Sequence, residues 1–314
     1  MPIPNKISGW TKEPEDLRDY GLDHPKAGNL LKMEKALPAK VSWRSKIWGI
    51  YNQLELGSCT ANAATGVYRS TYKLQQGKDT EDLSRLFVYK YTREMMGADG
   101  NGDSGAYIRT AIGSLARGGL PPERYWPYTD DPKKFDLVPP AFVYIEAQQN
   151  KILTYLKAET AGQTPATTLK NIKTALSKGQ LFEFGFTVYA SIYDTKNGDI
   201  PFPSKNEEVE GGHAIYAIGY DDTRKIKSRD GKTYTGAIEI VNSWGADWGD
   251  QGCGWLPYEY VLQGIAADWW TPLTEQYNDS SAFAGGDDSS NTGHGYAASV
   301  TSAMPIVSGT SGAE

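Results

Sequence analysis

A cysteine stands where a turn meets a helix near residue 59. Gly57 and Ser58 form a turn signal, and the Ala- and Tyr-rich residues 58–76 have the spacing of a buried helix that ends at Gly77. A thiol in the first turn of a helix lies at the positive end of the helix dipole, which favours the thiolate. Cys59 is therefore a candidate nucleophile, and Gln53, six positions earlier, is a candidate hydrogen-bond donor beside it.

The chain has only one other cysteine, Cys253. A Cys59–Cys253 disulfide and an inert buried thiol are the two structural alternatives for Cys59. Neither a Cys-x-x-Cys pair nor a His-Glu-x-x-His helix is present, so we expect no zinc site and no other cofactor. Residues 99–105 resemble the start of a calcium loop, but Ser104 and Thr110 stand where that loop needs glycine and glutamate. We interpret this segment as a glycine-rich loop.

A thiol nucleophile needs a base, and histidine is the usual one. The chain has three histidines. His24 falls in the N-terminal segment and His294 in a polar C-terminal segment, which leaves His213 at the start of a predicted strand. A lone strand histidine is also a common structural residue. Asn242, at the end of another predicted strand, is a candidate to orient the imidazole, or else the first residue of a turn.

Composition excludes several classes of protein. The chain has 314 residues, of which 39% are hydrophobic, enough for one large folded domain or two small ones. A net charge of −6 provides no broad basic surface for nucleic acid. No apolar run approaches the roughly 18 residues of a membrane span, and the N-terminus lacks the apolar core of a signal peptide. We expect a monomer without a membrane span, in the cytoplasm or exported by a route other than Sec.

The expected elements divide the chain into an N-terminal arm (residues 1–40), a folded domain (41–275) and a disordered tail (276–314). The alternative for the arm is a disordered leader. Within the domain, residues 45–130 favour helices and residues 135–270 favour strands. The predicted helices cover residues 30–37, 58–76, 83–96, 107–117 and 166–178, and the predicted strands cover residues 181–188, 212–220, 237–243 and 254–261.

Residues 221–236, between two of the predicted strands, are rich in lysine and arginine. A solvated hairpin is the ordinary interpretation of such a segment, and a basic binding arm is the alternative. We interpret it as a solvated hairpin.

Three motifs together resemble one family, the papain-like cysteine peptidases. They are Gln53 before Gly57-Ser58-Cys59, then Gly212-His213-Ala214, then Asn242-Ser-Trp-Gly-Ala-Asp-Trp-Gly-Asp-Gln-Gly252. The order Gln, Cys, His, Asn is that of the family, and the third motif is highly specific. The resemblance covers about residues 45–270. Motifs within residues 9–20, 84–87 and 104–109 resemble most the bacterial branch of the family, of which xylellain is an example.

The resemblance implies an α+β fold of two lobes, one mainly helical and one antiparallel and β-barrel-like, with the active site in the cleft between them. It implies that Cys59 is the nucleophile and that His213 is its general base and later its general acid. Asn242 would orient the imidazole. Gln53 and the backbone N–H of Cys59 would form the oxyanion hole.

The same resemblance suggests residues that contact the substrate. Ser104 and Gly105 stand where the family has a glycine pair that hydrogen-bonds an extended substrate. Ala214 would flank the adjoining pocket, and Gly212 is a further candidate substrate contact. Trp244 would shield the histidine–asparagine pair.

The chain also departs from the family pattern. Leu56 stands where a cysteine is usual, and Thr60 stands where an aromatic residue is usual. The disulfides of secreted relatives therefore have no partners here, which fits a reducing compartment or a fold stable without them. No long helical inhibitory prodomain is visible. The arm, with Trp10 and Tyr20, is instead the candidate to cross the cleft and block it.

The sequence thus predicts a cysteine endopeptidase that acts through an acyl-enzyme, with a peptide or protein as its partner and no nucleic acid. Two alternatives remain open. One is an amidase or acyl transferase that uses the same residues, and the other is a non-catalytic binding protein on a peptidase fold.

Overall fold

The computed structural model describes residues 7, 9–14, 16, 18–28, 30–32, 36–97 and 102–273. The predictions for the tail (276–314), for His294 and for residues 99–101 lie outside the described residues. Of the short helix expected over residues 30–37, residues 33–35 also lie outside them, and the described remainder is not helical. The described part of the arm holds one short 3-10 helix, η1 (Pro25–Ala27).

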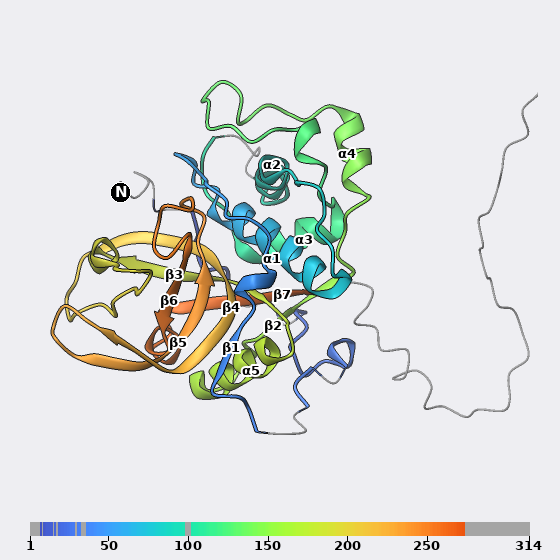
Figure 1. The fold of residues 1–314 in the computed structure, drawn as a ribbon. Coiled ribbons are helices and arrows are strands. Elements are labelled where there is room, and N and C mark those ends of the chain that lie inside the picture. The colour runs from blue at the N-terminus through green and yellow to red at the C-terminus, as the bar shows by residue number, and fades with distance from the viewer. Residues whose placement is uncertain are drawn as a thin grey trace, which may run out of the picture. The chain divides into compact units, whose positions relative to one another are not determined.

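Four helices gather on one side of the fold (Figure 1). They are α1 (Cys59–Gln76), α2 (Arg85–Met95), α3 (Ile108–Arg117) and α4 (Ala141–Ala147). The first three confirm the predicted helices to within two residues at each end. Gly77 ends α1 because it adopts the left-handed conformation, with φ of +67°, and its N–H bonds to the Lys73 carbonyl.

The helix α1 is the central element of the fold. Its first 13 residues are all buried, and it packs against α2, α3 and β4. A glycine on α1 permits the contact with β4. At Gly66 a Cβ atom would lie 2.7 Å from the ring of Tyr216 on β4, so only glycine lets the strand approach the helix so closely.

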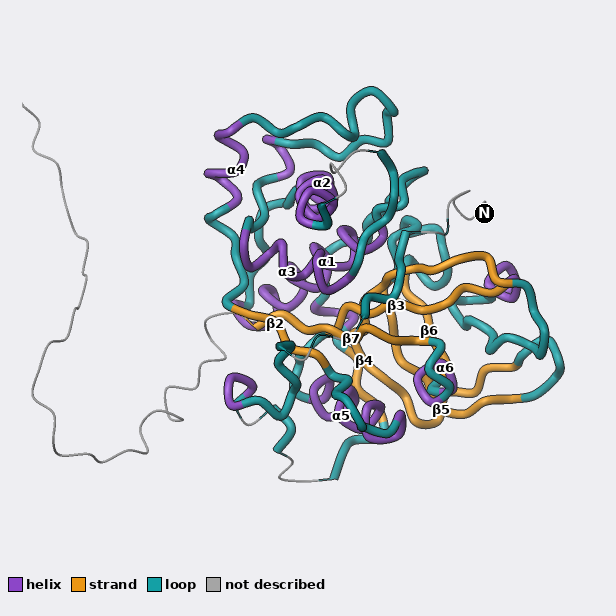
Figure 2. The backbone as a smooth tube through the Cα atoms, turned by 180° about the vertical axis from the view of Figure 1, so that it is seen from behind, coloured by secondary structure: helices purple, strands orange, loops and turns teal. Residues whose placement is uncertain are grey.

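Seven strands form one antiparallel sheet on the other side (Figure 2). They are β1 (Lys40–Ser42), β2 (Thr154–Lys157), β3 (Phe182–Tyr189), β4 (Val209–Lys227), β5 (Thr233–Val241), β6 (Cys253–Pro257) and β7 (Ala266–Leu273). Their order is β2-β7-β3-β4-β5-β6, and β1 pairs with β4 outside this path. Among the described residues the sheet does not close, so the second lobe is an open sheet and not a barrel. The two-lobe α+β fold is otherwise confirmed.

The remaining elements are α5 (Pro165–Ser177), α6 (Glu259–Leu262), η2 (Arg44–Lys46), η3 (Glu123–Tyr125) and η4 (Ala190–Asp194). The helix predicted over residues 166–178 is confirmed as α5, which Thr164 caps by accepting a bond from the Thr167 N–H. The strand predicted over residues 254–261 is wrong in its second half, because the chain leaves the sheet at Pro257 and turns into α6. None of the helices among the described residues is long and apolar enough to cross a membrane.

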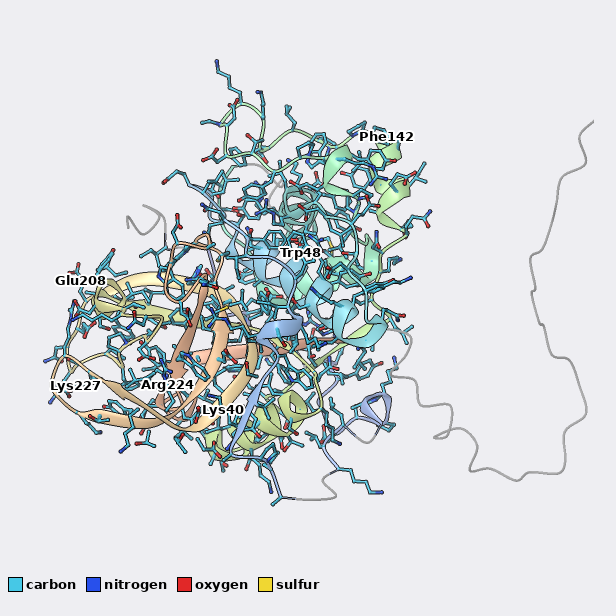
Figure 3. The ribbon with its side chains drawn as sticks, in the orientation of Figure 1. Lys40, Trp48, Phe142, Glu208, Arg224 and Lys227 are labelled. Carbon is cyan, nitrogen blue, oxygen red and sulfur yellow. The ribbon has the colours of Figure 1, made fainter. Side chains whose placement is uncertain are left out.

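Residues 221–236 are a hairpin, as predicted. The strands β4 and β5 stay paired as far as Lys227 and Thr233. Figure 3 shows Lys227 at the outer edge of the sheet, on the side away from α1 to α4, with Arg224 further in. Arg224 donates to Asp199 at 2.7 Å, and Arg229 pairs with Asp194. These arginines therefore form ion pairs within the chain.

Candidate active site

Cys59 is the first residue of α1, and its side chain has no exposed surface. Hydrogen bonds hold the turn before it on two sides. The hydroxyl groups of Ser58 and Tyr128 are 2.5 Å apart, and the N–H of Gly57 donates to Asp103 Oδ1 at 2.9 Å. The thiol is thereby fixed at the N-terminal end of the helix, as the sequence predicts.

His213 and Asn242 come together from neighbouring strands. His213 lies on β4, and Asn242 directly follows β5. The His213 Nε2 lies 2.8 Å from Asn242 Oδ1. An amide oxygen only accepts, so Nε2 carries the hydrogen and Nδ1 carries a lone pair. Nδ1 is buried and has no hydrogen-bond partner among the described residues, so it is available to accept a proton.

Aromatic rings cover the histidine–asparagine pair. The Trp244 ring stacks on the His213 ring with 4.6 Å between their centroids, and Trp248 meets Trp244 edge-on at 5.6 Å. Phe186 lies 5.9 Å from the imidazole. His213 is 1% exposed, so these rings exclude water from its bond to Asn242. The sequence assigned this shielding to Trp244.

Gln53 is buried, and its hydrogen bonds fix its amide. Ser243 Oγ donates to Gln53 Oε1 at 2.7 Å, and Gln53 Nε2 donates one hydrogen to the Leu56 carbonyl at 2.9 Å. The second hydrogen on Nε2 remains to donate elsewhere. The backbone N–H of Gln53 also bonds to the Ser243 carbonyl at 2.8 Å. The segment before Cys59 and the segment after β5 are therefore joined directly.

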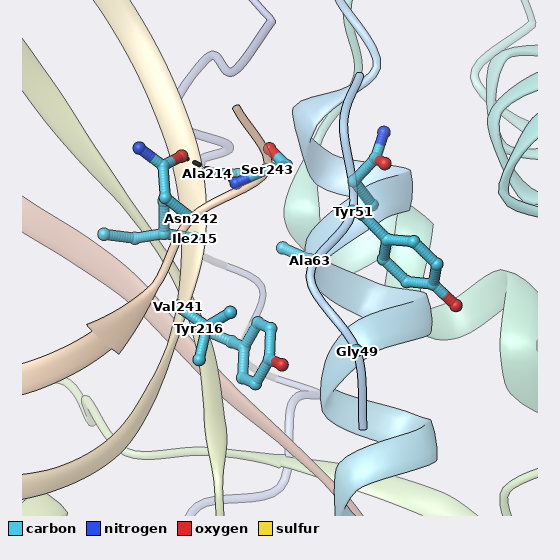
Figure 4. A pocket seen from close by; sticks show the side chains of 10 residues that line it. Gly49, Tyr51, Ala63, Ala214, Ile215, Tyr216, Val241, Asn242 and Ser243 are labelled. Carbon is cyan, nitrogen blue, oxygen red and sulfur yellow. Dashed lines mark hydrogen bonds between the residues drawn. The ribbon is translucent and has the colours of Figure 1, made fainter. Parts of the chain in front are cut away.

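Figure 4 shows the seam between the lobes, where Ala63 of α1 faces Ala214, Ile215 and Tyr216 of β4. The cavity at this seam holds about 10 Å³, which is room for a single water molecule. It is not a substrate cleft. The space beside the thiol is filled by the arm.

The arm crosses the candidate active site. The N–H groups of Gly9 and Trp10 both donate to the Gly212 carbonyl at 3.2 Å, and the Ala106 N–H donates to the Gly9 carbonyl at 3.0 Å. The arm thus bridges the sheet and the helical lobe. A Cβ atom on Gly9 would lie 2.5 Å from the Cys59 sulfur and 2.7 Å from the Gly57 carbonyl oxygen. Only a glycine fits over the thiol at this position.

Burial under the arm disfavours the charged forms of both the thiol and the imidazole. Burial raises the pKa of Cys59 to about 12, although hydrogen bonds from the Ala214 and Thr60 N–H groups act to lower it. Burial likewise lowers the pKa of His213 to about 4, against the opposing effect of its bond to Asn242. The helix dipole does not overcome the loss of water around the thiol while the arm is bound.

Of the candidate substrate-contact residues, Gly105, Gly212 and Ala214 lie along the path of the arm. Gly212 accepts both bonds from the arm, and the Ala214 N–H points at the Cys59 sulfur. Gly105 lies against Gly9, but its own N–H bonds to the Tyr89 hydroxyl, and it is Ala106 that donates to the arm. Ser104 makes its side-chain bond to the Gly105 carbonyl.

Sequence reasoning missed three residues that shape this site. Asp103 holds the turn before Cys59, Ser243 holds the Gln53 amide, and Asp268 on β7 accepts a hydrogen bond from Trp10. The sequence contained a signal for Ser243, because this residue follows Asn242 within the third motif. The signal for Asp268 was weaker: it is a single acidic residue within an apolar run.

Both cysteines are free, so the Cys59–Cys253 disulfide considered from the sequence is absent. Cys253 is buried in β6, and burial raises the pKa of its thiol to about 11. Among the residues that the structure describes, no group of three or more His, Cys, Asp or Glu side chains is placed to hold a metal ion.

The family model described as papain family cysteine protease matches residues 37–268. This match covers more than half of the chain and includes Gln53, Cys59, His213 and Asn242. The chain therefore belongs to the papain family of cysteine proteases, which are hydrolases.

Individual relatives agree with this assignment. An uncharacterized peptidase C1-like protein of Acanthamoeba polyphaga mimivirus is 36% identical over 224 residues, which are 70% of this chain and 68% of the relative. The thiol protease aleurain of Arabidopsis thaliana is 28% identical, over 74% of this chain and 59% of its own length. Xylellain, a cysteine protease of Xylella fastidiosa, has a solved structure that is 32% identical. It matches with a TM-score of 0.70 and covers 86% of this chain and 97% of xylellain, which agrees with the resemblance to the bacterial branch.

Proposed function

We propose that the protein is a peptidase that cleaves peptide bonds through Cys59, His213 and Asn242. The observation that supports this proposal most is the state of the imidazole. Its Nε2–H is bonded to Asn242 while its Nδ1 is unpartnered. The next residue, Ala214, forms a backbone hydrogen bond with Cys59, so β4 meets the first turn of α1 directly after His213. An unpartnered ring nitrogen near the thiol is what a general base requires, and this supports the proposal.

In the proposed reaction, His213 Nδ1 takes the thiol proton and the sulfur attacks the carbonyl carbon of the peptide bond. The Gln53 side-chain N–H and the Cys59 backbone N–H hold the resulting oxyanion. The imidazolium then gives its proton to the departing amine, which leaves a thioester on Cys59. Water attacks the thioester while His213 takes a proton from it. The acid product leaves, and the thiol recovers its proton.

Isotope labelling of the products tests this reaction. Cleavage of a synthetic peptide in ¹⁸O-water should place one ¹⁸O atom in the new carboxylate, because water opens the thioester. An added amine nucleophile distinguishes the alternatives. Acid as the main product supports the peptidase, whereas amide as the main product identifies an acyl transferase. A protein that turns over no peptide, with the arm bound or displaced, would reject the proposal in favour of a binding function.

The pH dependence of thiol alkylation is a further prediction. In the arm-bound protein the pKa of Cys59 is about 12, so the thiolate fraction increases with pH throughout the neutral range. Iodoacetamide should therefore modify Cys59 slowly at pH 7 and about tenfold faster for each unit of pH up to about 9. Peptide mapping by mass spectrometry measures this rate. A rate that is independent of pH between 6 and 9 would show that the resting thiol is already ionised.

We also propose that the arm inhibits the enzyme of which it is part. Gly9 lies on the Cys59 sulfur, so no substrate carbonyl reaches it while the arm is bound. The arm itself escapes cleavage because the Gly9 carbonyl is bonded to the Ala106 N–H, while the Gln53 amide bonds to Leu56. The carbonyl is therefore held by a donor outside the proposed oxyanion hole.

A cluster of ion pairs on α3 holds the arm in place. Arg109 lies 2.6 Å from Asp19 and 3.0 Å from Asp16, with Glu13 at 3.8 Å. All three acids belong to the arm. The arginine is 24% exposed, so solvent weakens these pairs but does not abolish their effect.

Arg109→Gln should therefore destabilise arm binding by about 1 kcal/mol and raise the turnover of a small peptide about fivefold. Activity against NaCl concentration provides the measurement. Turnover by the unmodified protein should rise with salt as the pairs are screened, and turnover by the variant should change less. Arg224→Gln, which breaks an ion pair away from the arm, is the matched control. Equal salt dependence in all three proteins would contradict the role of Arg109.

A further inference from the structure

A tyrosine joins the two halves of the proposed oxyanion hole. The Tyr128 hydroxyl donates to the Gln53 carbonyl at 2.7 Å and lies 2.5 Å from the Ser58 hydroxyl. Ser58 directly precedes Cys59. A carbonyl oxygen only accepts, so the one hydrogen of Tyr128 goes to Gln53, and Ser58 is the donor in the other bond. Burial raises the pKa of Tyr128 to about 12, so its hydroxyl keeps this hydrogen at neutral pH.

The chain of hydrogen bonds continues from Ser58 to an arginine. Asn62 Nδ2 donates to the Ser58 hydroxyl at 3.0 Å, and Arg85 Nη1 donates to Asn62 Oδ1 at 3.0 Å. Arginine only donates, and each group after it both accepts and donates, so every bond runs from Arg85 toward the Gln53 carbonyl. Hydrogen bonds that are aligned in this way polarise and strengthen one another. The charge of Arg85 therefore strengthens the bond that holds Gln53.

Arg85 is the first residue of α2 and lies in the motif of residues 84–87 that resembles the bacterial branch. Its guanidinium packs on two aromatic rings, 4.3 Å from the centroid of Tyr51 and 4.0 Å from that of Tyr128. Its Nη1 also donates to the Asn52 carbonyl at 3.1 Å. Since the side chain is only 11% exposed, these cation–π contacts are largely desolvated and hold it firmly. The arginine thus fastens the chain just before Gln53 to the start of α2.

The backbone next to Gln53 is strained. Leu54 has a φ of +53°, in the left-handed region that residues other than glycine rarely adopt. Such a conformation persists only where the surrounding structure over-determines it, and it is concentrated at functional sites. The carbonyl groups of the two residues before Leu54 are the acceptors of Arg85 and Tyr128. Without these bonds the segment would relax and carry the Gln53 amide with it.

We propose that Tyr128 and Arg85 are positioning residues for the oxyanion hole. Both act through Gln53 and Ser58 and not on the substrate itself. They hold the Gln53 amide at the distance from the Cys59 N–H at which both groups donate to one oxyanion. A donor that is misplaced by about 1 Å loses much of its effect on the rate. The inference rests on the proposed peptidase function.

The test uses the full-length protein in which Gly9→Ala displaces the arm, and this variant is the parent for every comparison. Tyr128→Phe in the parent should lower kcat for a fluorogenic peptide about tenfold and change KM by less than about twofold. The reason is that the oxyanion forms only as the substrate reacts. Tyr258→Phe is the matched control, because its hydroxyl donates to Asp222 at 2.6 Å on the sheet side of the fold. Its kcat should stay within about twofold of the parent.

Two further readouts separate positioning from a general structural effect. Iodoacetamide alkylates a thiol without forming an oxyanion, so alkylation of Cys59 in Tyr128→Phe should stay within about twofold of the parent. Gln53→Ala should lower kcat about 100-fold. Addition of Tyr128→Phe to Gln53→Ala should then lower kcat by less than about threefold, because residues that act through one group are not additive.

The same chain of bonds can be broken further from Gln53. Arg85→Gln and Ser58→Ala should each lower kcat about fivefold in the parent, as expected for the loss of one hydrogen bond. In the Tyr128→Phe background each should have an effect of less than about twofold. The Ser58 side chain does not cap α1, so its replacement removes no helix cap.

Three results would overturn the inference while leaving the peptidase function intact. They are an unchanged kcat in Tyr128→Phe, an equal loss of kcat in Tyr258→Phe, and alkylation of Cys59 that slows in parallel with kcat. A parent that cleaves no peptide would instead count against the peptidase function.

Hydrogen exchange provides a measurement that does not depend on cleavage. The backbone N–H groups of residues 53–58 should exchange at least about threefold faster in Tyr128→Phe than in Tyr258→Phe, because the segment opens locally once its carbonyl groups are released. Mass spectrometry of the peptide that covers this segment gives the rates. Equal exchange in the two variants would reject the positioning role, whether or not any peptide is cleaved.

Discussion

Cys59→Ala is expected to lower kcat/KM for peptide hydrolysis by on the order of 10⁴-fold or more, because it removes the only atom proposed to attack the peptide carbonyl. Loss of a catalytic nucleophile typically leaves only the acceleration due to binding and to the oxyanion hole. The same change should abolish modification by iodoacetamide at this position. Initial rates on a fluorogenic peptide, together with mass spectrometry of the labelled protein, provide both measurements.

Cys253→Ala is the matched control for this substitution. Cys253 is the other free thiol and is buried to a similar degree in β6, so its replacement tests for a general effect of losing a buried sulfur. Its activity should stay within about twofold of the unmodified protein, at a cost of about 1 kcal/mol in the free energy of unfolding. Activity that survives in Cys59→Ala, or is lost equally in both variants, would contradict the assignment of Cys59 as nucleophile.

Gly9→Ala should raise the turnover of a small peptide by the full-length protein by on the order of 100-fold. The added Cβ atom has no room, because it would lie 2.5 Å from the Cys59 sulfur and 2.7 Å from the Gly57 carbonyl oxygen. Both atoms are held by the start of α1 and cannot yield as the tip of a flexible side chain would. If the arm is open in about 1% of molecules, complete displacement gives this increase.

Displacement of the arm also changes the protonation of the site. Water that enters beside Cys59 removes the cause of its raised pKa, and the dipole of α1 then favours the thiolate. Alkylation of Cys59 at pH 7 should therefore accelerate together with turnover. This parallel distinguishes arm release from a change in substrate binding alone.

Gly49→Ala is the control for Gly9→Ala. A Cβ atom at Gly49 meets nothing within 4 Å, so the same chemical change is made without a clash. Its turnover should stay within about twofold of the unmodified protein. Unchanged turnover in Gly9→Ala, with the alkylation rate also unchanged, would show that the arm does not limit activity.

The first half of the fold was predictable because its signals are local. The helices α1 and α2 each have a serine at the start, a helical spacing of apolar residues and a glycine at or near the end, and α3 has the spacing and a final Gly118. The strands of the sheet were harder to predict from the sequence. Strands β1 and β2 are three and four residues long, too short to show a period, and β7 is buried on both faces, so it lacks the alternation of a half-exposed strand.

The sequence by itself determined the family, the two-lobe fold and the residues proposed to react. Cys59 is placed by a turn and a helix next to each other in the chain, and Asn242 lies within a motif specific enough to identify the family. These features depend on short-range order and on residue types that the chemistry requires. These features can be identified from the sequence without knowing which distant segments contact each other in the fold.

Only the tertiary structure decided what covers the thiol and what lies beside it. The bond from Trp10 to Asp268 joins residues 258 positions apart, and it depends on a register shift between β3 and β7 that no local pattern encodes. The contact of Gly9 with Cys59 likewise depends on the arm bonding to both lobes at once. Pairings between distant segments set these contacts, and so the covered thiol and the path of the arm became visible only in the folded chain.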